Sequence, residues 1–475
     1  MGRKLVCAAK IFFLLLLALA AGVWLNGVLN TNVRSYLTTD TGESEGSRIL
    51  FFGTSQGANG INPLFLWDAA GIEAYNFCAP GQYIGTTYYV MEDVLSRRRP
   101  QAAVLDIRSL TKPEDFLTIS NKLYSLPMIA DPLRRFSMYR DVIAEEWAYV
   151  IPLFRYHNRW KEIGRADFEQ SYTVLGCVGE HHVQTEQTAL PEIAEQEAQP
   201  IGERELAYLE RIAALAQEAG VPLVLLDMPC YTDEETEAKT QWVREWAAGR
   251  GIAFCEANRP QAYGGMGLTP EDFYDGNHLN LRGQEKVSSW LGLWLAEEFD
   301  LADARGTEAG DRWEEKIRLA RQVQNDRELA IRTDAEEIFS LLLSGDYTVA
   351  VSLTGSYRDG GEEIRRGLLS LGMEEAAYEK GGAFVWKSGE GWLFSSDGRP
   401  EFLWTCSPGR DELAVRGTGA LGEDGLWQTQ AELLMDRQNR EKTENGVNLL
   451  IYSNSQERLL KTIGFDAADG WRPLS

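Results

Sequence analysis

Five short apolar segments, separated by amphipathic helical patterns, constrain the fold of the first 300 residues more than any other feature. The segments are 49–53, 74–78, 103–107, 223–228 and 252–255. Strands that alternate with helices form parallel sheets that are covered on both faces. Between them, 204–220 and 282–296 carry apolar side chains at helical spacing. The sequence therefore predicts an α/β domain with a five-stranded parallel sheet.

Two polar motifs lie at opposite ends of this predicted domain. The first strand ends in GTS, whose serine is Ser55, and the motif DGNH supplies Asp275 and His278 just before the last helix. A serine hydroxyl is a poor nucleophile at neutral pH, so it needs an imidazole to take its proton and a carboxylate to orient that imidazole. The chain has only four histidines. Ser55, His278 and Asp275 are therefore candidates for a catalytic triad.

The two motifs, in this order, resemble the first and last blocks of the SGNH/GDSL hydrolase superfamily. The surrounding sequences GTSQGANGINPLFLWDAAGIEAYNFCAPGQ and DFYDGNHLNLRGQEKVSSWL are similar to its bacterial cell-surface branch, which includes the D-alanyl transfer protein of teichoic acid synthesis and the alginate-type O-acetylation proteins. The resemblance covers residues 48–298. It implies a flavodoxin-like sheet in which Ser55 is the nucleophile, His278 the base and Asp275 the group that orients it.

The family's middle blocks concern the oxyanion hole, and here the chain departs from the pattern. The turn NFCAPGQ offers Gly81 as the counterpart of the second-block glycine. The third block usually reads Gly-x-Asn-Asp, whereas this chain has LDIRS and no asparagine, which leaves Arg108 as the candidate donor. Preorganised donors stabilise the developing oxyanion. We therefore expect an oxyanion hole made of the Ser55 and Gly81 N–H groups and Arg108, a departure that fits a transferase or a slow enzyme as well as an efficient hydrolase.

More than a hundred residues separate the third and fourth strands, which predicts an insertion at 111–200 over the active edge. Within it, His157, Arg159 and Trp160 form a group suited to stacking on a sugar and binding a carboxylate or phosphate. The alternative is that Trp160 anchors a core and His157 is a surface residue. The pair His181-His182 lacks a third ligand, so no metal ion and no other cofactor is predicted.

The N-terminus carries an uncharged apolar run at 11–28, preceded by Arg3, Lys4 and Lys10. Its length and basic flank predict a single-pass membrane anchor within 1–30 that leaves the bulk of the chain outside the cytoplasm. The alternative is a signal peptide that is cleaved near the small residues of 17–21.

Charge and cysteine content exclude several classes of protein. The formal net charge of −24 argues against nucleic-acid binding and disfavours polyanionic ligands, so a neutral polysaccharide is at least as plausible a substrate as a teichoic acid. The six cysteines have no paired spacing. Cys230 and Cys255 end neighbouring predicted strands, where they either pair or, as the preferred interpretation has it, serve as small core residues.

The composition changes after residue 300. A polar linker with a connecting helix is predicted at 301–333, followed by a glycine-punctuated β-rich domain at 334–475. The phrases DAEEIFSLLLSGDYTVAVSL, LLSLGM and GVNLLIYSNSQERLLKTIGFD loosely resemble the interleukin-like EMT inducer (PANDER-like) domain. That resemblance implies a β-sandwich with a glycan-binding accessory role.

Together these features predict an SGNH-type domain at 45–300 that is anchored in the cell membrane. It would act as a serine esterase or O-acyltransferase on acyl groups, chiefly acetyl, of a cell-envelope polysaccharide. The resemblance also implies a membrane-bound O-acyltransferase as a partner. One alternative is a noncatalytic glycan-binding or assembly protein on the same scaffold. A secreted lipase is a weaker alternative, because no further apolar motif suggests a lipid surface.

Overall fold

The computed structural model describes residues 2–29, 42–112, 125–143, 161, 173–179, 188–192, 196–396, 398–409, 411–422 and 427–474. The chain divides into two compact units, Met1–Ala320 and Arg321–Ser475. Most of the predicted insertion at 111–200, including His157, Arg159, Trp160 and the pair His181-His182, lies outside the described residues.

The first unit is built on a five-stranded sheet whose strands all run parallel, in the order β2-β1-β3-β4-β5. This confirms the predicted parallel α/β sheet. The strands are β1 (Ile49–Phe52), β2 (Ala74–Asn76), β3 (Ala102–Asp106), β4 (Leu223–Asp227) and β5 (Ala253–Glu256). Each lies within a residue or two of the segment predicted from apolar runs.

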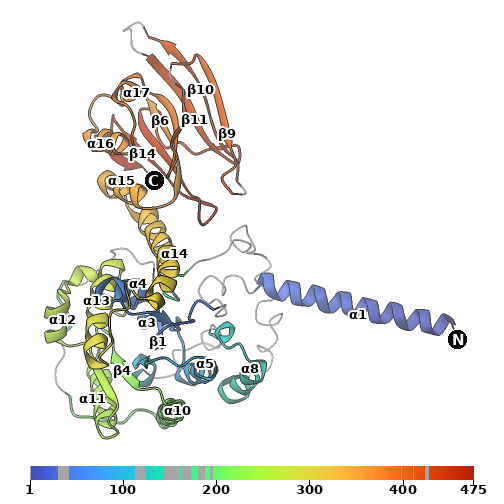
Figure 1. Cartoon of the computed structure of the whole chain (residues 1–475), viewed down its shortest axis with the longest axis vertical. Helices are drawn as coiled ribbons and strands as arrows, with labels where there is room; N and C mark the ends of the chain where they lie inside the picture. The colour runs from blue at the N-terminus through green and yellow to red at the C-terminus, as the bar shows by residue number, and fades with distance from the viewer. Residues whose placement is uncertain are drawn as a thin grey trace. The chain divides into compact units, whose positions relative to one another are not determined.

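Helices cover both faces of this sheet (Figure 1). Side chains of α4, α12 and α13 form one apolar core with Phe51, Val104 and Val224 of the strands. On the other face, where α5 and α10 lie, Leu50, Leu105 and Leu225 are also fully buried. The helices of the unit are α3 (Ser55–Gly60), α4 (Pro63–Ala70), α5 (Ile84–Arg97), α6 (Arg108–Thr111), α8 (Pro132–Met138), α10 (Glu203–Ala219), α11 (Glu234–Ala248), α12 (Pro260–Met266) and α13 (Leu281–Glu298), with short 3-10 turns at Leu126–Met128 and Pro270–Asp272 and a π-helical turn at Tyr139–Ile143.

An N-terminal helix, α1 (Gly2–Leu29), covers the segment for which a membrane anchor is predicted. In the part of the chain that the structure describes, no helix has the combination of length and apolar character that crossing a membrane requires.

The second unit contains two antiparallel sheets. A six-stranded sheet has the order β15-β14-β13-β6-β7-β8, and a four-stranded sheet has the order β12-β11-β10-β9. The strands are β6 (Tyr347–Thr354), β7 (Gly382–Lys387), β8 (Gly391–Ser395), β9 (Glu401–Cys406), β10 (Leu413–Leu421), β11 (Trp427–Met435), β12 (Gln438–Asn439), β13 (Gly446–Ser453), β14 (Arg458–Asp466) and β15 (Arg472–Leu474). The β-rich character of the C-terminal part is as predicted.

Two apolar cores show how this unit is layered. The first lies between the sheets and includes Val385 of β7, Val415 of β10 and Leu450 of β13. The second lies between the six-stranded sheet and a layer of helices, which are α15 (Ala335–Ser344), α16 (Glu362–Ser370) and α17 (Glu375–Lys380). The sequence did not predict α16 and α17. The long helix α14 (Glu308–Ile331) spans the division between the units, and its residue Leu329 belongs to the second core.

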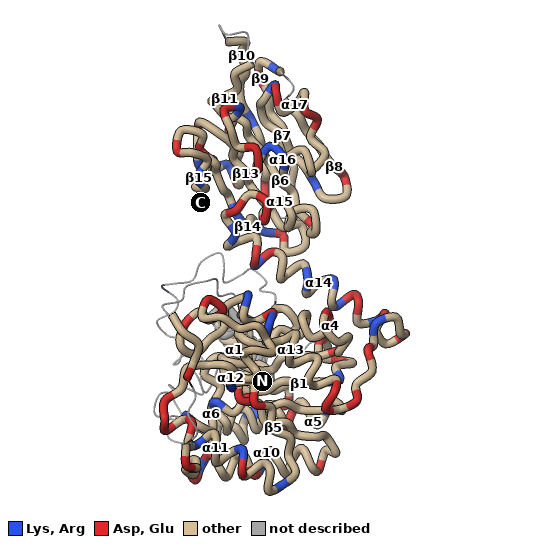
Figure 2. The backbone as a smooth tube through the Cα atoms, turned by 90° about the vertical axis from the view of Figure 1, so that its left-hand side faces the viewer, with Lys and Arg blue, Asp and Glu red and all other residues tan. Residues whose placement is uncertain are grey.

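Figure 2 shows that Lys and Arg are scattered among Asp and Glu in both units. Cys230 and Cys255 are both buried and free, which agrees with their interpretation as core residues.

Candidate active site

The chain turns sharply where β1 ends, and this turn presents Ser55. Gly53 has φ +147°, and a Cβ at that position would lie 2.5 Å from the Cβ of Asp106. The Asp106 carboxylate, at the end of β3, accepts hydrogen bonds from the backbone N–H (2.9 Å) and the hydroxyl (2.5 Å) of Thr54. Glycine is therefore required in the GTS motif, because only a residue without a side chain lets the turn approach β3 this closely.

Ser55 is the first residue of α3, and buried amides hold this short helix in place. Asn76 Nδ2 donates to the carbonyls of Gly57 (2.9 Å) and Ile61 (2.7 Å), while its Oδ1 accepts from Cys78 N–H. Gly57 permits this packing, since a Cβ there would lie 2.4 Å from Cys78 Sγ. The position of Ser55 is thus set by contacts with the chain that follows β2.

The DGNH loop precedes α13 and folds around its own aspartate. Asp275 Oδ1 accepts hydrogen bonds from the backbone N–H groups of Asn277 (2.6 Å) and His278 (2.8 Å). Asn280 caps α13 by accepting from the N–H groups of Arg282 and Gly283. This local network fixes the direction in which the His278 side chain leaves the loop.

The structure brings the three triad candidates together in one hydrogen-bonded chain. His278 Nδ1 lies 2.9 Å from Asp275 Oδ2 and 3.0 Å from Oδ1, and His278 Nε2 lies 2.9 Å from Ser55 Oγ. An ionised carboxylate only accepts hydrogen bonds, so the Nδ1 atom carries a proton, and in the neutral ring Nε2 then faces the serine with its lone pair. In this arrangement the imidazole can take a proton from Ser55. The His278 side chain keeps 22% of its surface exposed, so the group is also reachable by a substrate.

Hydrogen bonding keeps the Asp275 carboxyl in its charged form. Partial burial acts to raise the pKa of Asp275, but hydrogen bonds from the His278 ring and from the N–H groups of Asn277 and His278 outweigh it, so the pKa lies below its usual value. A carboxylate that stays ionised at neutral pH can orient the imidazole and stabilise the imidazolium that forms during catalysis.

Both remaining oxyanion candidates lie at the carboxyl edge of the sheet. Gly81 follows β2 with φ +63°, in a loop that is tied to the nucleophile turn by a hydrogen bond from Ala79 N–H to the Gly53 carbonyl (3.0 Å). Arg108 follows β3, and its Nη2 donates to Asn277 Oδ1 (2.8 Å) while Nη1 lies 3.8 Å from Cys230 Sγ. In this structure the Arg108 guanidinium therefore anchors the loop that carries Asp275 and His278.

Three residues of the site were not selected from the sequence. Asp106 positions Thr54, Asn76 holds α3, and Asn277 receives the Arg108 side chain. Asp106 and Asn76 end strands β3 and β2, and polar side chains at the carboxyl ends of parallel strands gather at one edge of a sheet.

Among the described residues, no group of three or more His, Cys, Asp and Glu side chains is placed to hold a metal ion. The three substrate-binding candidates His157, Arg159 and Trp160 lie outside those residues. The site is thus described by Ser55, His278, Asp275 and their neighbours at the sheet edge.

Neither a comparison with known protein families nor a search of characterised proteins found a match for this chain. The resemblance to SGNH hydrolases therefore depends on the motifs themselves.

Proposed function

We propose that this protein is an SGNH-type serine esterase or O-acyltransferase that acts on acyl groups, chiefly acetyl, of a cell-envelope polysaccharide. The observation that carries the proposal is the chain of hydrogen bonds from Ser55 Oγ through His278 to Asp275. A buried structural serine needs only one partner, whereas this hydroxyl faces an imidazole whose second nitrogen is bound to a carboxylate.

The geometry supports a two-step acyl transfer. Ser55 Oγ attacks the acyl carbonyl carbon while His278 Nε2 takes the hydroxyl proton, and the tetrahedral oxyanion is held by the N–H groups of Ser55 and Gly81. As the intermediate collapses, the imidazolium returns its proton to the departing alkoxide, which leaves as an alcohol. Water or a sugar hydroxyl then attacks the acyl-enzyme, with His278 again as base, and Ser55 is regenerated. Hydrolysis and transfer differ only in this acceptor.

A fluorophosphonate probe tests the enzyme assignment directly, because it reacts with activated serines. We expect the purified wild-type protein to be labelled at Ser55, and Ser55→Ala and His278→Ala to lose the label while keeping the wild-type circular dichroism spectrum. Absence of label on folded wild-type protein, or label that survives in Ser55→Ala, would contradict the proposal.

A noncatalytic glycan-binding or assembly protein is the second candidate, and one observation favours it. The third strand supplies no asparagine, and the Arg108 guanidinium that stands at that place is bonded to Asn277. An oxyanion hole with two backbone donors alone stabilises the transition state less than one with three. A folded protein that resists labelling and still binds the polysaccharide would identify this function.

The proposed location is the outer side of a cell membrane, with the N-terminal segment as a single-pass anchor. It is supported by the apolar run at 11–28 and its basic flank. Protease added to intact protoplasts should degrade the region beyond residue 40. Complete protection of that region would contradict the topology.

A membrane-bound O-acyltransferase is the proposed donor partner. Removing that partner should abolish acetylation of the polysaccharide.

A further inference from the structure

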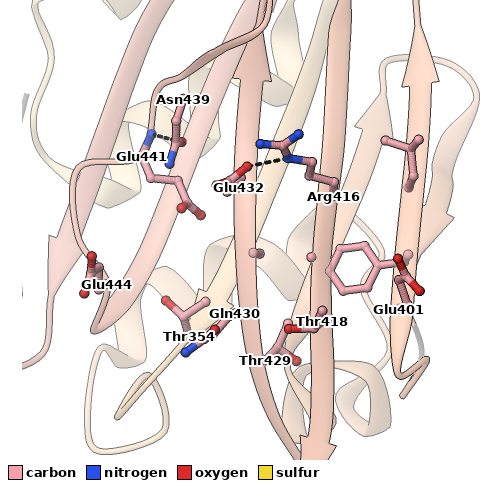
Figure 3. A pocket seen from close by; sticks show the side chains of 14 residues that line it. Thr354, Glu401, Arg416, Thr418, Thr429, Gln430, Glu432, Asn439, Glu441 and Glu444 are labelled. Atoms are coloured by element: carbon pink, nitrogen blue, oxygen red, sulfur yellow. Dashed lines mark hydrogen bonds and ion pairs between the residues drawn. The ribbon is translucent and has the colours of Figure 1, made fainter.

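A cavity of about 680 Å³ lies in the second unit beside the four-stranded sheet (Figure 3). Its lining comes from β9, β10, β11, β12, the end of β6 and the loop between β12 and β13. The size is within the range of small-molecule binding sites. This cavity belongs to the second unit alone and contains none of the residues of the Ser55 site.

Small residues and one aromatic ring shape the cavity. Gly417 of β10 is paired with Ala431 of β11, and both residues line the cavity. The Phe402 ring lies against Gly417, since a Cβ at 417 would be 2.7 Å from Phe402 Cζ. The Phe402 side chain, of which 5% is exposed, therefore forms an apolar part of the cavity lining.

Three polar atoms that border the cavity lack a hydrogen-bond partner among the described residues. They are Thr354 Oγ1, Thr429 Oγ1 and Glu441 Oε1. Both threonines are more than nine-tenths buried, with 6% and 8% of their surfaces exposed. Leaving a buried hydroxyl unpaired costs about 1–3 kcal/mol, so such atoms mark places where a ligand can supply the missing bond.

The charge of the lining is strongly negative. The lining contains four glutamates, Glu401, Glu432, Glu441 and Glu444, and among the described lining residues one cation, Arg416, which is bonded to Glu432 at 2.5 Å. The pKa of Glu441 is raised to about 7, chiefly by burial and also by the neighbouring carboxylates of Glu432 and Glu444, against hydrogen bonds from Ser352 and Asn439 that lower it. A positive charge placed beside the Glu441 carboxyl would therefore stabilise its ionised form.

The side chains that line the cavity indicate which kind of cation it can bind. In the described residues no three acidic, histidine or cysteine side chains converge closely enough for a metal ion. A ligand that satisfies the lining needs a positive group for the carboxylates, hydroxyls for the two threonines and a face of C–H groups for Phe402.

We propose that this cavity binds a sugar with a free, protonated amine, as found in de-N-acetylated glucosamine or galactosamine residues of a polysaccharide. The ammonium group lies against Glu441 and Glu444, sugar hydroxyls bond Thr354 and Thr429, and one face of the ring packs on Phe402. This inference goes beyond the proposed acyl chemistry and does not depend on it. The negative charge of the cavity lining would also favour a cationic glycan over an anionic one.

Isothermal titration calorimetry on the whole protein tests the proposal with two matched probes, a glucosamine tetramer and its fully N-acetylated form. At neutral pH we expect the glucosamine tetramer to bind at least about tenfold more tightly, because acetylation removes the charge. Its affinity should fall as salt is raised, since screening weakens ion pairing.

Variants then assign the binding to the cavity. Glu441→Gln should weaken binding of the glucosamine tetramer at least tenfold, and Thr429→Val about threefold or more. Glu374→Gln, an exposed glutamate before α17 and away from the cavity lining, should bind as wild type. Circular dichroism of each variant establishes that it is folded.

The competing outcomes each overturn the proposal. They are equal binding of the acetylated tetramer, no binding of the glucosamine tetramer at millimolar concentration, and wild-type affinity in both folded cavity variants. Tighter binding of a lysine peptide of the same charge would show that the cavity takes a peptide instead of a sugar. None of these results bears on labelling of Ser55, so this site and the proposed enzyme activity fail or survive separately.

Discussion

His278 Nε2 lies 2.9 Å from Ser55 Oγ, although 223 positions of the chain separate the two residues. A buried amide network joins the elements that carry them. Gln284 of α13 accepts a hydrogen bond from Asn62 Nδ2 (2.8 Å) and donates one to the Asn59 carbonyl of α3 (2.6 Å). The helix that follows the DGNH loop is therefore tied directly to the helix that begins with Ser55, which holds the pair in register.

If Ser55 and His278 form one nucleophilic unit, their replacement should be non-additive. We expect Ser55→Ala and His278→Ala each to lower acetate release at least about 10³-fold, and the double variant to lose little more. Asp275→Asn should cost less, because it orients the base without being the base. Melting temperatures should stay close to wild type.

Ser289→Ala, at a serine of α13 with no hydrogen bond to the triad, serves as the control. Retained acetate release, or retained acetyl transfer to the polysaccharide, in the folded double variant would remove the enzyme assignment.

Gly53→Ala should destabilise the first unit by roughly 2–4 kcal/mol, because the new Cβ collides with Asp106 and the backbone has φ +147°. Gly264→Ala is the matched control, since a Cβ at that helical position meets nothing within 4 Å. Thermal unfolding of the two variants checks the difference. Equal melting temperatures would mean that the turn relaxes without cost.

Arg108 and Asn277 should act together if the guanidinium works by anchoring the DGNH loop. Arg108→Ala and Asn277→Ala should then lower turnover by similar factors, and the double variant by no more than either, as for residues that share one interaction. Additive losses in a folded double variant, with normal fluorophosphonate labelling of Arg108→Ala, would instead assign Arg108 a separate part in the oxyanion hole. A kinetic double-mutant cycle distinguishes these outcomes.

The buried carboxyl of Asp227 should make stability depend on pH. Its pKa is raised to about 8, chiefly by burial and also by the nearby Glu237 charge, against Arg259 and Arg244, which lower it. The folded state therefore holds a proton that the unfolded chain releases near pH 4, so stability falls as pH rises from about 4 to 8. Asp227→Asn should abolish this loss and gain on the order of 4 kcal/mol over wild type between pH 5 and pH 9.

Unfolding of wild type and Asp227→Asn across this pH range measures the effect. Asp311→Asn, at an exposed aspartate of α14, should differ from wild type by the same small amount at every pH. A flat difference for Asp227→Asn as well would show that its carboxyl is ionised in the folded protein.

The end of α14 should be needed for a stable second unit. Leu329 is fully buried in its core, Asp326 accepts a hydrogen bond from Ser453 Oγ (2.7 Å), and Gln322 accepts one from Asp346 N–H (2.9 Å). A fragment of residues 321–475 should melt cooperatively. A fragment of 334–475 should melt about 5–10 °C lower, because losing a buried leucine costs about 2 kcal/mol. Identical melting of the two fragments would place the structural boundary at 334.

The sequence by itself predicted the five strands of the first unit, two of its helices and the residue types of its candidate site. The apolar run at 49–53 could only be a buried strand, and Ile49–Phe52 is fully buried. The motifs around Ser55 and His278 indicated which side chains the structure brings together. They could do so because only a few residue types can serve as a nucleophile, a base or an orienting acid. These features are local or chemical, so they can be read from neighbouring residues.

Only the tertiary structure decided which distant side chains meet. Arg108 was selected as an oxyanion donor from its strand-end position, yet its partner Asn277 is 169 positions away and no local pattern identifies it. The short helices α16 and α17 were missed because packing against the six-stranded sheet stabilises them more than their own propensity does. The cavity beside Phe402 and the unpaired hydroxyls of Thr354 and Thr429 likewise exist only once separate strands are paired. Hydrogen bonding and desolvation depend on distances in space, and those are fixed by the packing of the whole fold.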